Sequence, residues 1–248
     1  VDGAARVTTH FVTVADAMRE QYLAAGIGKP EQYTRIFSGF PLEPLLNVPN
    51  DPLLRARYGL APDDFVIGKI ARLFKLKGHD ELFAIAPQLI EANPKIKFLL
   101  VGDGEWRARF EQMARATGLQ PHFIFTGLIP PAQIPAHIGI MDLLVHLSTR
   151  EGLARALPMA LAAGKPVVAY DCDGAREVCL DGQTGFLIRP GHLHLLRERL
   201  LLLARDSNLR VQLGANGRAL VEAQFSVQKM VEQLHSLYTR LAGGRLPQ

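Results

Sequence analysis

The chain has 248 residues, of which 48% are hydrophobic and 21% charged, a balance typical of a globular protein with a full core. No apolar run is as long as a membrane span, and the first residues lack the basic and apolar segments of a secretory signal. The net charge of +4 comes from dispersed Lys and Arg residues without a zinc-finger or RNA-binding motif, which argues against nucleic acid as a partner.

Residues 1–41 are predicted to be a remnant of an N-terminal domain. Short β-rich strands are expected at residues 11–14 and 34–37, with a helix at 15–25 between them. Residues 42–52 contain prolines and little hydrophobic periodicity, which predicts a hinge or linker.

Strands and helices alternate through residues 53–241, and residues 242–248 are expected to form a tail. Strands that are apolar throughout are predicted at residues 66–71, 96–101, 123–126, 143–147, 167–170 and 186–188. Helices are predicted at residues 79–92 (with a kink at Pro87), around 110–113, and at 134–140, 156–163, 175–180, 193–204, 209–223 and 227–241. This alternation predicts an α/β fold, in which a Rossmann-like parallel sheet carries helices on both faces. Ligands bind such sheets at the carboxyl ends of the strands.

The loop after the first of these strands carries two cations. Gly68 lies in the strand, and Arg72 and Lys77 follow it five residues apart. The forked guanidinium of Arg and the point charge of Lys together match the charge of a diphosphate. A solvated basic loop explains the same residues equally well.

Glycine turns follow the next two strands. Gly102 and Gly104 allow a tight turn and the close approach of a ligand, although a plain strand-to-helix turn needs them as well. The third glycine of a dinucleotide fingerprint is missing, which argues against an NAD-dependent oxidoreductase. Gly127 and Leu128 form the second turn, where backbone groups are placed to contact a base.

The loop between residues 148 and 160 carries the most information. Gly152 to Ala156 is expected to open a helix, whose free N–H groups and dipole favour a phosphate. Glu151 would repel that phosphate, so we interpret its carboxylate as an acceptor for sugar hydroxyls. A helix N-terminal Glu stabilised by the dipole is the structural alternative.

The order and spacing of these motifs resemble the C-terminal domain of the group 1 glycosyltransferases, which are retaining enzymes with the two-domain GT-B fold. Residues 11–40 also resemble the last strand and helix of that family's N-terminal domain. The resemblance spans residues 67–241 and rests on the segments Gly68…Arg72-Leu73…Lys77-Gly78, Val101–Gly104, Phe125–Gly127, Glu151–Leu153, Ala162–Val168, Gly174–Val178 and Asp181–Leu187.

The resemblance implies roles for individual residues. Arg72 and Lys77 would hold the donor's diphosphate, and Glu151 would hold hydroxyls of the donor sugar. The implied donor-binding residues are Gly68, Gly102 and Gly104, Gly127 and Leu128 near the base, the backbone of Gly152, Leu153, Ala154 and Arg155 at the distal phosphate, and Met159. No metal or other cofactor is implied, since the cations take its place.

Met159 departs from the family pattern. The family carries a second glutamate at this position, eight residues after the first, directed at the ribose hydroxyls. A thioether is a poor acceptor for those hydrogen bonds. Ribose binding is then weakened, supplied by another group, or lost together with activity.

A second acidic motif, Asp171-Cys172-Asp173, resembles the paired-carboxylate metal site of a different glycosyltransferase fold. It follows a predicted strand and precedes Gly174, so we interpret it as a turn with capping aspartates. The histidines show no metal-ligand spacing.

We therefore expect a retaining glycosyltransferase that uses a nucleoside diphosphate sugar, with this chain forming mainly the donor-binding half. The chain alone should bind donor without turnover, because catalysis in this fold needs both domains to close. One alternative is a non-catalytic nucleotide-sugar-binding or scaffold protein, which Met159 favours. The other is a dinucleotide oxidoreductase.

The sequence also predicts a location and further partners. The chain opens at Val1, which we interpret as a cut in a longer protein, so the missing N-terminal domain is one partner. The acceptor is expected to be a sugar, a lipid or a small molecule. Cys172 and Cys179 fit a reduced compartment, which favours the cytoplasm. A pI near 9.2 suits an anionic donor, or peripheral contact with the inner face of the membrane.

Overall fold

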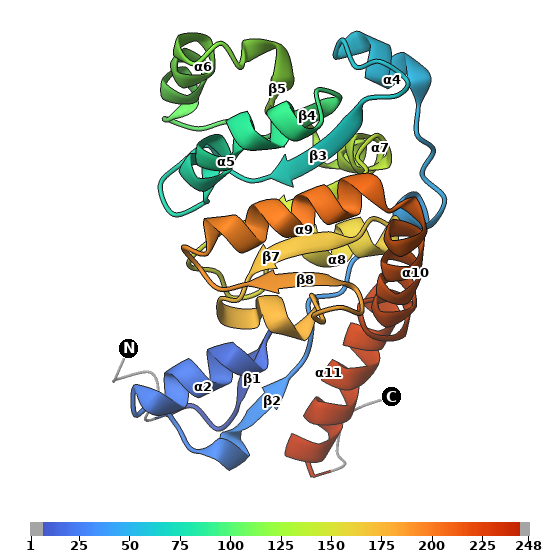
Figure 1. Cartoon of the computed structure of the whole chain (residues 1–248). Helices are drawn as coiled ribbons and strands as arrows, with labels where there is room; N and C mark the ends of the chain where they lie inside the picture. The colour runs from blue at the N-terminus through green and yellow to red at the C-terminus, as the bar shows by residue number, and fades with distance from the viewer. Residues whose placement is uncertain (1–6, 244–248) are drawn as a thin grey trace.

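The larger part of the chain folds around one parallel sheet (Figure 1). The computed structural model describes residues 7–243. Its six main strands lie in the order β5-β4-β3-β6-β7-β8. Their bounds are Phe65–Ile70 (β3), Ile96–Val101 (β4), Phe123–Gly127 (β5), Leu143–His146 (β6), Val167–Tyr170 (β7) and Gly185–Ile188 (β8). From β3 the chain continues outward through β4 to β5, and from β6 it continues toward the opposite edge through β7 to β8. The crevice for a ligand therefore lies between β3 and β6, where the direction reverses.

Helices cover both faces of this sheet, and the core is divided into two apolar layers. One face carries α5 (His79–Ala92), α6 (Arg107–Ala116) and α9 (Leu193–Arg205). The other carries α3 (Glu43–Leu46), α7 (Ile134–Gly139), α8 (Ala156–Ala162) and α10 (Ser207–Gln224). The central strands are buried on both faces, which is why their sequences are apolar throughout.

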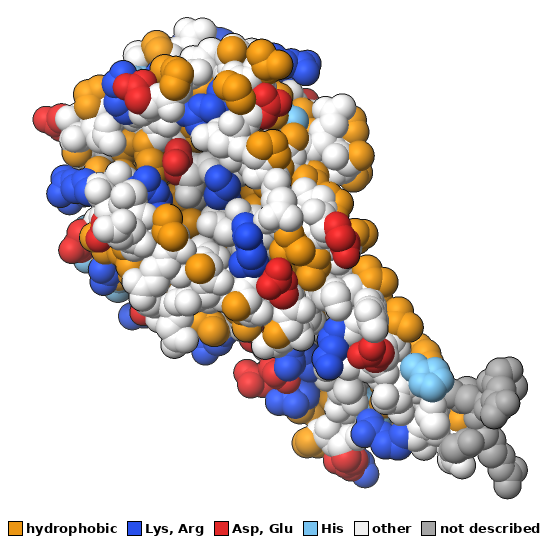
Figure 2. All heavy atoms as spheres, turned by 90° about the vertical axis from the view of Figure 1, so that its right-hand side faces the viewer, with side chains coloured by type: hydrophobic (Ala, Val, Ile, Leu, Met, Phe, Trp, Pro, Cys, Tyr) orange, Lys and Arg blue, Asp and Glu red, His pale blue; other side chains and the backbone are white. Residues whose placement is uncertain are grey.

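A smaller unit projects from this body, as the space-filling view shows (Figure 2). It holds β1 (Phe11–Thr13), α2 (Asp16–Ala24) and β2 (Tyr33–Arg35), whose two strands pair in parallel, and α11 (Val227–Leu241) lies beside them (Figure 1). Phe37 stacks on Phe225 with ring centroids 4.3 Å apart, which joins the segments entering and leaving the unit. On the face seen in Figure 2, basic and acidic side chains are interspersed.

The predicted α/β fold with a Rossmann-like parallel sheet is confirmed. The segment expected to be a linker is more structured than its prolines indicate, because it forms α3 and the start of α4 (Pro52–Arg57), and Leu42 and Leu45 are buried in the core. The domain boundaries themselves stay predictions. The tail predicted at 242–248 lies outside the described residues from 244 onward.

One local prediction is corrected and another is confirmed. The helix expected at residues 175–180 is instead a short 3-10 turn, Asp173–Glu177, because the chain must return at once to β8. The helix predicted at residues 79–92 is confirmed, since α5 runs from His79 to Ala92 with Pro87 on its exposed side, and the kink at Pro87 stays a prediction. Further 3-10 turns are Pro30–Gln32, Gln120–His122 and Pro131–Gln133. No helix among residues 7–243 has the length and hydropathy that crossing a bilayer requires.

Candidate functional site

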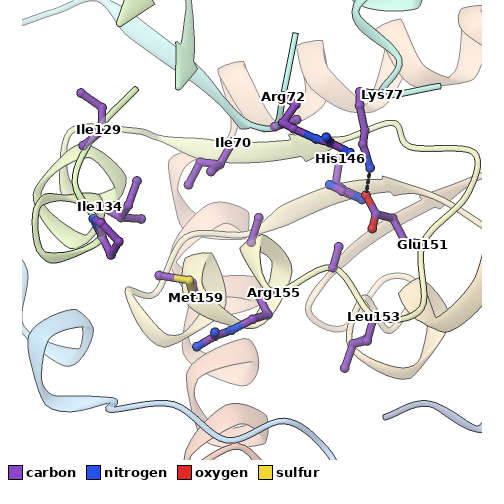
Figure 3. Close-up of a pocket in the computed structure, with 14 residues that line it drawn as sticks. Ile70, Arg72, Lys77, Ile129, Ile134, His146, Glu151, Leu153, Arg155 and Met159 are labelled. Carbon is purple, nitrogen blue, oxygen red and sulfur yellow. Dashed lines mark hydrogen bonds and ion pairs between the residues drawn. The ribbon is translucent and has the colours of Figure 1, made fainter. Parts of the chain in front are cut away.

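A cavity of about 540 Å³ lies at the carboxyl ends of β3 and β6 (Figure 3). Three stretches of the chain, residues 70–77, 129–134 and 146–159, build its walls, as expected for the switch point of such a sheet. The lining residues are Ile70, Ala71, Arg72 and Lys77 after β3, Ile129, Pro131 and Ile134 after β5, His146 at the end of β6, and Glu151, Leu153, Ala154, Arg155, Ala156 and Met159 around the start of α8.

Lys77 and Glu151 form an ion pair at one end of the cavity (Figure 3). The two side chains are 17% and 31% exposed, so the pair is partly shielded from water. Gly78 brings the loops together, because its φ of +69° and the backbone of Leu147 leave no room for a Cβ. The structure thus places a cation beside the carboxylate predicted to contact a sugar.

Arg72 lies beside this pair on the cavity wall (Figure 3). Its guanidinium lies over the ring of Phe74 at 5.7 Å, which orients the side chain by a cation–π contact. The backbone carbonyl of Arg72 is 3.1 Å from the Nε2 of His79, so the loop is anchored to the first turn of α5. The predicted pair of cations, Arg72 and Lys77, therefore faces one cavity.

Three buried basic groups lie at this charged end, Lys69 and His79 behind the wall and His146 in the lining itself, and sequence reasoning missed them. Burial lowers the pKa of Lys69 to about 7 and the pKa of both His79 and His146 to about 3. Lys69 Nζ, His79 Nδ1 and His146 Nε2 have no hydrogen-bond partner within the described part of the chain. The one available signal was a lysine inside an otherwise apolar strand. Both imidazoles are neutral at pH 7, so they add no charge to the cavity.

The opposite end of the cavity is apolar. Ile70, Ile129, Ile134 and Met159 form this wall, and none of these side chains is a useful hydrogen-bond donor or acceptor (Figure 3). Met159 is half-buried and packs on the apolar layer beneath α8. The replaced glutamate position therefore faces the cavity, with other apolar side chains around it.

The helix predicted at residues 156–163 is confirmed as α8, Ala156–Ala162, but residues 152–155 do not form its first turn as expected, which is a correction. The carbonyl of Gly152 accepts a hydrogen bond of 3.1 Å from the N–H of Gly174, and a Cβ at Gly152 would lie 2.6 Å from Met18 of α2. These contacts hold residues 151–154 as an irregular loop. Leu153, Ala154 and Arg155 still line the cavity, ahead of the first turn of α8.

Gly152 does not line the cavity, and neither do five further predicted donor-binding residues: Gly68, Gly102, Gly104, Gly127 and Leu128. The structure gives the first three a packing reason, since a Cβ would collide with Met141 at Gly68, with the Ala71 carbonyl at Gly102 and with the Leu73 carbonyl at Gly104. Gly127 has a φ of +73°, and the side chain of Leu128 is 81% exposed. Contact of these five with a ligand stays a prediction.

No group of three or more His, Cys, Asp or Glu side chains among residues 7–243 is arranged to hold a metal ion. The Asp171-Cys172-Asp173 motif forms a turn at the end of β7, in which Asp171 pairs with Arg176 at 2.9 Å. Asp173 faces the loop of Glu151 and accepts a hydrogen bond from its backbone N–H.

Residues 50–220 match the family model for "Glycosyl transferases group 1". The match covers more than half of the chain, so this chain belongs to the group 1 glycosyltransferases. The site residues Arg72, Lys77 and Glu151 all lie within the matched region.

Individual relatives agree with this assignment. The chain is 25% identical over 241 residues to the capsular polysaccharide biosynthesis glycosyltransferase CapM of Staphylococcus aureus, covering 93% of this chain and 61% of that protein. It is 33% identical over 172 residues to a GDP-mannose-dependent phosphatidylinositol monomannoside mannosyltransferase of Mycolicibacterium smegmatis, covering 66% of this chain and 45% of that protein.

The structure is similar to crystal structures of HepE from Anabaena. The complex of HepE with UDP superposes with a TM-score of 0.89 at 28% identity, over 97% of this chain and 66% of HepE. The complex with UDP-glucose gives a TM-score of 0.86 at 29% identity, over 95% of this chain and 66% of HepE. This chain therefore spans roughly half to two thirds of the length of these relatives.

Proposed function

We propose that this chain is the donor-binding half of a retaining glycosyltransferase that uses a nucleoside diphosphate sugar. The observation that carries the proposal is the Lys77–Glu151 pair beside Arg72, in a cavity at the switch point of the sheet. Such a set offers cations to a diphosphate and a carboxylate to sugar hydroxyls. Similarity to HepE, which has been crystallised with UDP and with UDP-glucose, supports this class of ligand.

The ion pair gives the site a way to respond to its donor. An incoming diphosphate competes for the ammonium of Lys77, and the carboxylate of Glu151 is then released to accept hydrogen bonds from the sugar. As the glycosidic bond breaks, negative charge develops on the leaving diphosphate, where Arg72 and Lys77 stabilise it. These cations do the work that a metal ion does in other transferases, so we propose that no metal is required.

The remaining parts of the reaction belong to the longer protein. We expect the acceptor, a sugar, a lipid or a small molecule, to bind to an N-terminal domain that closes on the cavity. The chain by itself is therefore expected to bind donor without transferring its sugar. A cytoplasmic position, with peripheral contact at the inner face of the membrane, fits a lipid acceptor and stays part of the proposal.

A second function is favoured by one observation. Met159 leaves the apolar end of the cavity without a carboxylate, which suits a non-catalytic nucleotide-sugar-binding or scaffold protein. A full-length protein that binds the donor tightly and transfers no sugar to any acceptor would support this alternative.

Calorimetric titration of the chain with UDP, GDP and ADP, each with and without an attached sugar, tests the main proposal. One nucleoside diphosphate should bind, and Arg72→Ala should weaken its binding about tenfold, since a charge-assisted contact is lost. Lys75→Ala removes an exposed charge from the same loop and is the matched control. Binding of NAD in place of every nucleoside diphosphate would instead favour a dinucleotide enzyme.

A further inference from the structure

Asp173 lies where the small unit meets the charged end of the cavity. Its φ of +49° is in the left-handed region, which among the non-glycine residues of the described chain only Leu76 shares. Leu76 directly precedes Lys77, and Asp173 is hydrogen-bonded to the backbone of Glu151. Each member of the Lys77–Glu151 pair therefore contacts or adjoins a residue with an unfavourable left-handed backbone. Such conformations persist where the surrounding structure requires them, and they concentrate at functional sites.

The two carboxylate oxygens of Asp173 contact different parts of the molecule. Oδ2 accepts a hydrogen bond of 2.5 Å from the backbone N–H of Glu151, in the wall of the cavity. Oδ1 accepts a hydrogen bond of 2.6 Å from Nε2 of Gln21, in α2 of the small unit. These partners lie 22 and 152 positions away in the sequence, so one carboxylate joins the cavity to the small unit.

Contacts on both sides of Asp173 strengthen this junction. On the cavity side, the N–H of Gly174 donates to the carbonyl of Gly152 at 3.1 Å. On the side of the small unit, the carboxylate of Glu177 accepts a hydrogen bond of 3.1 Å from the backbone N–H of Ala17. The turn 173–177 is therefore held between α2 and the loop that carries Glu151.

We propose that Asp173 is a positioning residue, which couples the placement of α2 to the placement of Glu151 and so to recognition of the donor sugar. The inference rests on the proposed role of Glu151 toward the sugar. Arg72 and Lys77 come from the other loop and neither bonds directly to Asp173, although Lys77 pairs with Glu151, so the coupling acts mainly on the sugar and less on the diphosphate. A movement of the small unit relative to the sheet thereby changes sugar binding.

Titration of Asp173→Gly with UDP and with UDP-glucose tests the proposal. Glycine removes both hydrogen bonds and accepts the positive φ, so the fold keeps its backbone without the junction. The affinity for UDP-glucose should fall about tenfold while that for UDP changes less than about twofold, since the sugar contact is displaced more than the diphosphate contacts. Asp171→Asn, in the same turn but bonded to Arg176, should leave both affinities unchanged. Equal losses for both ligands, or no loss for either, would overturn the proposal.

Hydrogen exchange of the unliganded chain gives a readout that does not depend on the donor. Amides of residues 149–153 should exchange faster in Asp173→Gly, and Gln21→Leu should produce a smaller change in the same direction. Unchanged exchange in both variants would overturn the coupling, even if the chain bound no nucleotide. Absence of UDP, GDP and ADP binding in the parent, together with the expected exchange, would refute the donor proposal and leave the junction standing.

Discussion

The two ends of the cavity differ in chemistry and in how the chain maintains them. The charged end combines Arg72, Lys77 and Glu151 from two loops, with buried bases behind them and a glycine contact that holds the loops together. The apolar end is an ordinary hydrophobic surface, to which Ile129, Ile134 and Met159 belong. Strained backbone and polar side-chain atoms without a partner are therefore found at the charged end. The side chains that form the apolar end have neither.

This difference indicates where affinity and selectivity arise. In the proposed donor complex, a diphosphate would gain charge-assisted hydrogen bonds at the charged end, and each such bond is about twice as strong as a neutral one. A nucleoside at the apolar end gains area of contact without directional bonds from those side chains. We infer that the charged end supplies most of the binding energy, and that the apolar end discriminates weakly between nucleosides.

The largest effect is expected from Gly78→Ala, which forces apart the loops of the charged end. An alanine at φ +69° is strained, and its Cβ would collide with the Leu147 backbone, so the free energy of unfolding should fall by about 3 kcal/mol. Chemical denaturation measures the loss. Gly118→Ala is the matched control, because it has a φ of +70° and open space around it, and it should cost only about 1 kcal/mol. Equal losses at the two sites would show that the packing of Gly78 is unimportant.

Lys77→Ala should weaken binding of the nucleoside diphosphate by about a hundredfold, close to 2.7 kcal/mol. The variant removes a cation and also leaves the Glu151 carboxylate unpaired, where it repels the phosphates. Titration calorimetry at low and high salt measures the change. The double variant Lys77→Ala with Glu151→Gln should recover part of the loss. If it recovers none, the carboxylate does not face the phosphates.

The fold and the charged end were predictable from the sequence for the same reason. Each apolar strand and the loop that follows it form one continuous stretch of sequence. The spacing of Arg72, Lys77 and Glu151 within these loops could therefore be recognised without coordinates. The contact between Lys77 and Glu151 could not, because it joins residues 74 positions apart. The conformation of residues 152–155, which were expected to open α8, was mispredicted for a related reason, since this loop is fixed by tertiary contacts to Gly174 and Met18.

The buried basic side chains were missed because burial, and not residue type, determines their protonation state. Lys69 and His146 lie on strands whose neighbours along the chain are apolar, and nothing local reveals that their polar atoms have no partner. The Asp173 junction was hidden in the same way, since its motif is also that of an ordinary turn. Sequence reasoning thus identified the groups that face a ligand and missed the groups that hold them.

Acidification should weaken the charged end before the rest of the core. The pKa of His79 and of His146 is about 3 in the folded chain and 6.5 in the unfolded chain, so the unfolded state binds more protons between these values. This contribution to stability is therefore present above pH 6.5 and falls as the pH drops toward 3, by about 3 kcal/mol per histidine near pH 4.5. Denaturation of His146→Leu should show a shallower pH dependence than the parent, whereas the exposed His235→Leu should match it. If the unfolding free energy of His146→Leu depended on pH as steeply as that of the parent, the imidazole of His146 in the parent would be solvated.

The smallest effect is expected from Met159→Glu, which places a carboxylate at the apolar end. With methionine present, UDP and 2′-deoxy-UDP should bind within about twofold of each other, because no side chain of that wall accepts a bond from the 2′-hydroxyl. The variant should prefer UDP by about fivefold, near 1 kcal/mol, while Met159→Leu keeps the parental ratio. Competition titration with the two nucleotides measures the ratios. A parent that already prefers UDP tenfold would show that backbone groups or another side chain recognise the ribose, and that the apolar end is selective without a carboxylate.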